Sequence, residues 1–199
     1  MAKRVIGAGL AGGVTLIAWT FVVNGILGFQ TRIDMKPIAA EREVYEVLKQ
    51  NIVSPGRFVA NPAPTSAGRF PDNEPVFSIL YGGVGHESAG GLALIGLAAF
   101  LVAPMIVAWM LSQASDEVLS SYPRRVLFCA AIGVLLAVLS DLPSFGIGEY
   151  PLGDAVLLAA NHVVAWTLVG VVLATRLGPR GETGSAKTRE EGGHSRLDA

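Results

Sequence analysis

Four long apolar stretches alternate with polar segments along this chain. They run from Val5 to Phe29, from Gly90 to Ser112, from Val126 to Leu142 and from Gly153 to Thr175. A helix needs roughly 17 to 25 apolar residues to cross the hydrocarbon layer of a bilayer, and each stretch is about that long. The pattern predicts an all-α membrane protein with four transmembrane helices, in a domain that covers residues 1–177.

The composition agrees with this prediction. Hydrophobic residues make up 51% of the chain and charged residues only 16%, and the mean hydropathy is +0.50. The charges are almost confined to the segments between the apolar stretches, whereas a soluble domain would scatter them along amphipathic helices. The net charge of -1 therefore says little, and the position of each charge matters more.

Lysine and arginine near the ends of the spans predict the orientation, because these residues favour the cytoplasmic side. Six basic residues lie between the first two stretches, and none lies between Val126 and Thr175. We therefore expect a multi-pass protein of the cell membrane with both termini in the cytoplasm. The nine basic residues on the predicted cytoplasmic side are Lys3, Arg4, Arg124, Arg125, Arg176, Arg180, Lys187, Arg189 and Arg196.

The polar segment 30–88 is then an extracytoplasmic insert between the first two spans. Pro37, followed by apolar residues at spacings of three and four up to Ile52, predicts an amphipathic helix. The runs Arg57 to Ala60 and Pro75 to Tyr81 predict the two strands of a loose hairpin. This insert could dock a partner, cap a cavity or serve only as a structured connector.

The last segment, 178–199, is rich in Gly, Ser, Thr, Arg and Glu and has almost no apolar residues. Such a composition cannot bury enough apolar surface to fold, so we predict a disordered cytoplasmic tail. Its acidic residues nearly balance its basic ones, which argues against a lipid-binding tail.

His162 lies near the middle of the fourth stretch, beside Asn161. Ionisable groups at that depth are costly and are candidates for function. Three roles remain open for His162: a structural hydrogen bond between helices, the handling of protons or ions, and ligation of a haem. A haem held by two histidines needs a second one at the same depth, and His86 comes before the second stretch. We therefore expect no cofactor.

Acidic residues surround the connection between the third and fourth stretches. Asp141 precedes Pro143, which predicts the end of a helix, and Asp154 can favour the start of the next helix by facing its positive end. The alternative is an acidic vestibule, formed with Glu149, that gathers cations or binds a metal. Carboxylates without a histidine at ligand spacing are a weak metal signature, so we expect no metal site.

Small and polar residues within the spans predict where helices pack. Gly9 with Gly13 and Gly170 with Ala174 have the small-xxx-small spacing that lets two helices approach closely. Asn24, near the outer end of the first stretch, is a further candidate polar residue that would bond to a neighbouring helix. The partner helix could belong to the same chain or to another copy.

Several of these features resemble a family of small four-helix bacterial membrane proteins without an assigned activity. The matching places are Trp19, the helix from Glu43 to Ile52, the run Pro55-Gly56-Arg57-Phe58, and Asp141-Leu142-Pro143 before the last span. The resemblance covers most of the chain and implies a bacterial inner-membrane protein of this architecture. It implies no activity and no site.

Motifs for catalysis are missing from the sequence: it has no Gly-rich phosphate loop, paired-cysteine site, Gly-x-Ser-x-Gly or His-Glu-x-x-His. We therefore predict no catalytic residues and a non-enzymatic role, as an accessory or structural component of a membrane assembly. The expected partners are the lipid bilayer and a membrane protein or further copies of the chain, and no nucleic acid. The alternative is a small oligomeric transporter or channel that uses His162, Asn161 and Asp141. A membrane enzyme or electron carrier is the third possibility.

Overall fold

The computed structural model describes residues 2–34, 36–84, 89–144 and 150–178. Within these residues, four helices are long and apolar enough to cross a membrane. They are Ala2–Ile26, Leu94–Ser112, Tyr122–Ser144 and Leu152–Arg176. The structure thus supports the predicted class, a mostly helical multi-pass membrane protein. Except for Gly178, the predicted tail lies outside the described residues.

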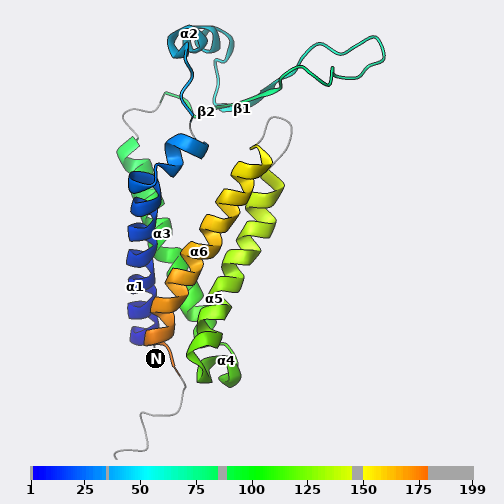
Figure 1. Ribbon diagram of the computed structural model, residues 1–199. Helices are drawn as coiled ribbons and strands as arrows, with labels where there is room; N and C mark the ends of the chain where they lie inside the picture. Colours follow the sequence, from blue (N-terminus) through cyan, green and yellow to red (C-terminus); the bar gives the residue numbers. More distant parts are fainter. Residues whose placement is uncertain (1, 35, 85–88, 145–149, 179–199) are drawn as a thin grey trace, which may run out of the picture.

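The first two spans pack side by side as an antiparallel pair (Figure 1). Helix α1 (Ala2–Phe21) continues as the π-helical segment η1 (Val22–Ile26) and pairs with α3 (Ala89–Ser112). The span ends before the predicted Phe29 because the chain turns at Gly28, whose φ of 65° lies in the left-handed region that favours glycine.

The third span begins earlier than its apolar pattern predicted. Helix α5 (Tyr122–Leu136) includes Arg124 and Arg125, which the sequence placed in a connection. Pro123 explains the difference, since proline fits the first turn of a helix and its fixed φ favours a helical start. The short helix α4 (Asp116–Ser120) precedes α5 and was not predicted.

The third span ends at Ser144, two residues beyond the predicted end at Leu142. The chain stays helical through the π-helical segment η3 (Ala137–Asp141) and one 3-10 turn, η4 (Leu142–Ser144). Pro143 is accepted there because it lies in that final turn rather than inside an α-helix. Asp141 lies inside the span, as the predicted stretch from Val126 to Leu142 already had it.

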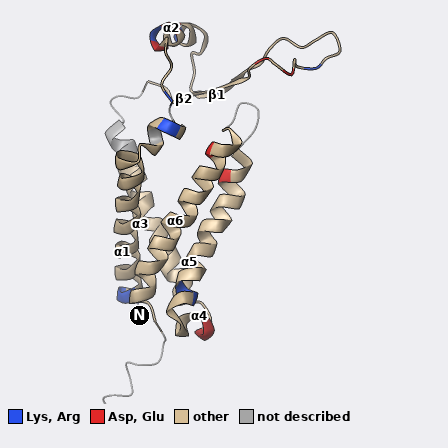
Figure 2. Ribbon diagram, in the orientation of Figure 1, with Lys and Arg blue, Asp and Glu red and all other residues tan. Residues whose placement is uncertain are grey.

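Helix α6 (Leu152–Arg176) lies between α1 and α5 and contacts both (Figure 1). Its last turn reaches the start of α1, where the Nε of Arg4 donates a hydrogen bond of 2.6 Å to the carbonyl oxygen of Arg176. The two outer ends of the described chain, Ala2 and Gly178, therefore lie at the same end of the bundle. The charged residues of the spans also gather near the two ends of the bundle (Figure 2).

Glycines lie where two helices come closest. A Cβ on Gly9 or Gly13 would stand 2.6 Å from Met105 or 2.8 Å from Leu101, both in α3. A Cβ on Gly170 would stand 2.7 Å from the Cβ of Cys129 in α5. The small residues thus separate into two contacts within the chain, α1 with α3 and α6 with α5. Ala174, the other predicted packing residue, is buried.

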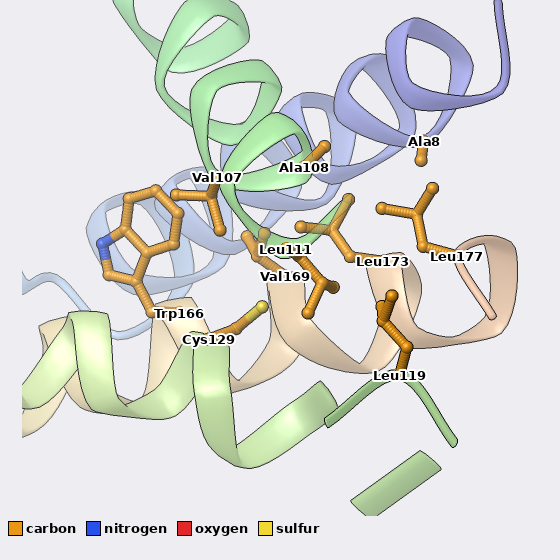
Figure 3. Close-up of a cluster of buried hydrophobic side chains, with 10 residues drawn as sticks. All are labelled: Ala8, Val107, Ala108, Leu111, Leu119, Cys129, Trp166, Val169, Leu173 and Leu177. Carbon is orange, nitrogen blue, oxygen red and sulfur yellow. The ribbon is translucent and has the colours of Figure 1, made fainter. Parts of the chain in front are cut away.

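One cluster of buried hydrophobic side chains joins α1, α3, α4, α5 and α6 (Figure 3). Trp166 is the member of this cluster in α6 farthest from the end at Arg176, and Val107 of α3 belongs to the same cluster. Toward the other end, α3 exposes large apolar side chains such as Leu94 and Leu97. The core residues are Ala8, Val107, Ala108, Leu111, Leu119, Cys129, Trp166, Val169, Leu173 and Leu177.

The insert lies beyond the end of the bundle opposite to Ala2 and Arg176 (Figure 1). It contains helix α2 (Glu41–Asn51) and the strands β1 (Gly56–Ala60) and β2 (Phe77–Tyr81). The strands pair antiparallel, with Phe58 opposite Ile79, and the chain between them extends away from the helices. The side of the membrane on which the insert lies stays a prediction.

Candidate functional site

The most distinctive polar contact within the spans joins Asp141 to His162. The Nδ1 of His162 lies 2.6 Å from the Oδ2 of Asp141, a separation typical of a strong hydrogen bond to a charged group. The Asp141 side chain is 8% exposed, and that of His162 is 41% exposed. The carboxylate of Asp141 is thus buried, whereas the imidazole of His162 is partly exposed.

Two local features bring this pair together. Asp141 is the last residue of the π-helical turn η3, whose i→i+5 hydrogen bonds place side chains at other angles than a regular α-helix does. Gly133 lets the backbones of α5 and α6 approach, since a Cβ there would stand 2.9 Å from the carbonyl oxygen of His162. The imidazole can therefore reach the carboxylate across the helix interface.

The pair can do two things chemically. The hydrogen bond links α5 to α6, which fixes the rotation of one helix against the other. In addition, an imidazole that donates from Nδ1 to a carboxylate keeps its Nε2 as a second place to bind or release a proton. The same geometry is therefore compatible with a packing role and with proton handling.

Asn161 faces a different neighbour. The Nε1 of Trp19 in α1 donates a hydrogen bond of 2.9 Å to the Oδ1 of Asn161. Because consecutive residues of a helix point in different directions, Asn161 bonds to α1 while His162 bonds to α5. Helix α6 is thus tied to both neighbours at one level of the bundle.

Of the three residues named for an acidic vestibule, the structure describes Asp141 and Asp154. Asp154 lies in the first turn of α6 and pairs with Lys36 at 2.6 Å, away from the Asp141–His162 pair. Glu149 and His86 lie outside the described residues. In the parts of the chain that the structure describes, no group of three His, Cys, Asp or Glu side chains could hold a metal ion.

Asn24 does not join the Asp141–His162 pair. It lies exposed in η1 and lines an open hollow with Thr20 of the same span and Gly96 of α3. Its surroundings are mostly apolar, which suits a packing contact with lipid or protein.

Sequence reasoning missed a buried charged residue, Arg125. Its side chain lies in the first turn of α5, and its Nη1 donates to the carbonyl oxygen of Leu119 in α4. The available signal was Pro123, which marks a helix start and so places Arg125 inside the bundle rather than in a loop.

Polar groups inside the spans thus connect α6 with α1 and α6 with α5. Neither a protein-family model, nor a curated protein, nor a solved structure matches this chain. The family resemblance described from the sequence therefore stays a prediction.

Proposed function

We propose that this protein is a non-enzymatic accessory component of a membrane assembly, and that its insert docks a partner protein. One observation carries the proposal: the insert presents large apolar side chains to its surroundings. Val53, after α2, is 85% exposed, and Leu80, in β2, is 81% exposed. Further exposed apolar residues of the insert are Ile38, Tyr45, Val47, Val59, Phe70, Phe77 and Val84.

This exposure is unfavourable for a segment that stands alone in water. A two-stranded hairpin is marginally stable by itself, and burial of apolar area is the main force that would hold it. Large exposed apolar surfaces often mark interaction sites, and the insert exposes many large apolar side chains. Helix α2 and strand β2 also border a cavity of about 380 Å³, lined by Leu48, Ile52 and Ile79 among others. A partner that covers this surface would stabilise the insert.

Leu80→Asp is expected to release the partner without disturbing the membrane helices, because it places a charge on the exposed face of β2. The measurement is purification in a mild detergent through a tag on the C-terminal tail, followed by mass spectrometry. The wild type should carry a stoichiometric partner protein. The matched control is Ser66→Asp, which adds the same charge at an exposed polar position of the insert and should retain the partner. A wild-type preparation that holds only this chain would contradict the proposal.

The proposal places the insert outside the cytoplasm and both termini inside it. In a Cys129→Ser background, a membrane-impermeant maleimide should label Ser66→Cys in intact cells. It should label Ser185→Cys, in the tail, only after the membrane is opened. Labelling of both positions in intact cells, or only of the tail, would contradict this orientation.

A small transporter or channel is the second candidate, and the Asp141–His162 contact favours it. Ionisable residues inside a membrane are functional candidates, and π-helical turns such as η3 are frequent at functional sites. The 41% exposure of the His162 side chain leaves room for a proton or an ion to reach the pair.

The transporter hypothesis predicts that reconstituted protein conducts protons or cations across vesicles loaded with a pH-sensitive dye. Asp141→Asn keeps the shape of the side chain and removes its charge, so it should reduce this flux at least about tenfold if the carboxylate takes part in proton transfer. Trp19→Phe is the control, since it removes the neighbouring bond to Asn161 and leaves the pair intact. Wild-type vesicles that leak no faster than empty ones would exclude this candidate.

A further inference from the structure

At the end of the bundle that holds Ala2 and Gly178, the buried Arg125 has no carboxylate partner among the described residues. Arg125 is 9% exposed, and its Nη1 donates to the carbonyl oxygen of Leu119. Its Nε is buried and meets no hydrogen-bond acceptor in the described part of the chain. A charge removed from water is costly unless an opposite charge compensates it. The surroundings of Arg125 therefore favour an anion.

A second arginine faces the same space. The Nη2 of Arg4 and the Nη1 of Arg125 lie 3.8 Å and 3.9 Å from the point where a Cβ on Gly178 would stand. Arg4 comes from α1 and bonds through its Nε to the carbonyl oxygen of Arg176. Among the ion pairs of the described residues, none joins a carboxylate to either arginine. Two like charges that lie close together repel each other, and an anion between them would favour both.

The position of this space indicates which anion would occupy it. Arg4, Arg125 and Arg176 lie in the terminal turns of three spans, where a membrane helix leaves the hydrocarbon layer. The phosphates of phospholipids lie at that depth. The planar guanidinium group matches a phosphate through two parallel hydrogen bonds, and basic pockets between membrane helices bind anionic head groups. Gly178 has no side chain to fill the space.

We propose that Arg4 and Arg125, beside Gly178, form a binding site for the phosphate of an anionic phospholipid head group. This site is separate from the Asp141–His162 pair and does not depend on the accessory role proposed above. The lipid would connect α1, α5 and the end of α6 at one point.

Titration of the full-length protein in mild detergent with phosphatidylglycerol tests the proposal, with retained lipid measured by native mass spectrometry. Arg4→Gln should weaken binding about fivefold, as expected for one basic residue near an anionic surface. Lys3→Gln removes the same charge at the neighbouring exposed position and should leave binding unchanged. Equal losses in the two variants, or no loss in Arg4→Gln, would overturn the site.

A second variant keeps the test independent of any folding defect. Gly178→Glu would supply a carboxylate beside both arginines, where a Cβ makes only ordinary contacts. We expect it to abolish specific retention of phosphatidylglycerol, whereas Gly178→Gln should keep more of it. Undiminished retention by Gly178→Glu would refute the proposal.

Competition with inorganic phosphate distinguishes a lipid from a free ion, because both carry the phosphate group that the arginines would bind. If phosphate alone displaces phosphatidylglycerol at millimolar concentration, the site recognises the free ion and the lipid assignment is wrong. No displacement would support a lipid head group held at the membrane surface.

Discussion

Gly133→Ala should destabilise the bundle, although alanine normally favours a helix over glycine. The new Cβ would stand 2.9 Å from the carbonyl oxygen of His162, 2.9 Å from the Cα of Val163 and 3.0 Å from the Cβ of Trp166. Two of these atoms belong to the backbone of α6, so a change of rotamer cannot relieve the clash. We expect a loss of about 1–3 kcal/mol, the usual cost of overpacking. The measurement is thermal or denaturant unfolding of purified protein in detergent.

Gly96→Ala is the matched control, because glycine again lies inside a membrane helix but has no atom within 4 Å of the added Cβ. Here only helix propensity changes, and the substitution should be neutral or stabilise the protein by up to about 1 kcal/mol. If both substitutions shift stability in the same direction by the same amount, the close α5–α6 contact at Gly133 is wrong.

His162→Leu should destabilise the protein by about 1–3 kcal/mol, since it leaves the buried Asp141 carboxylate without its hydrogen bond. Asp141→Leu should cost a similar amount, because the imidazole loses its acceptor. The double variant, with leucine at both positions, should recover most of the loss, as replacement of both members of a pair by apolar groups can be nearly neutral. Unfolding of the four proteins in detergent gives the coupling energy directly.

The double variant also distinguishes the two proposed roles of the pair. If Asp141 and His162 only fix the packing of α5 against α6, a well-folded double variant keeps its partner and its cellular function. If they handle protons, the same protein folds well and loses its flux. Destabilisation of the double variant equal to the sum of the single variants would show that the two residues do not interact.

The span boundaries show how far local sequence signals reach. The apolar run predicted α6 almost to the residue, since Gly153 to Thr175 became Leu152–Arg176. The start of α5 was missed because Arg124 and Arg125 look like a charged connection, whereas Pro123 and the packing of Arg125 under α4 extend the helix to Tyr122. A hydropathy pattern ends an apolar stretch at a charged residue even when, as for Arg125, neighbouring helices bury its side chain.

The sequence predicted the candidate polar residues, but it did not predict which residues they bond to. His162, Asn161, Asp141 and Asp154 could each be selected as polar groups in or near an apolar segment. Their partners could not be chosen, because His162 and Asp141 belong to different helices and the η3 turn that directs Asp141 has no marker in the sequence. In the same way, Asp154 was grouped with Asp141 by its position in the chain, while the fold pairs it with Lys36 from the insert.

The number of spans and the membrane class follow from the residues alone, because insertion of a helix into lipid depends on the length and apolarity of that one segment. The choice of which helices pack together was decided only in three dimensions. The hydrogen bonds of Trp19 with Asn161 and of Asp141 with His162 depend on the rotation and depth of two helices at once. The same is true of the approach of Arg4 and Arg125 to Gly178. The sequence of one helix does not determine its rotation and depth relative to its neighbours. Within lipid these depend on close packing and specific hydrogen bonds between helices rather than on apolarity.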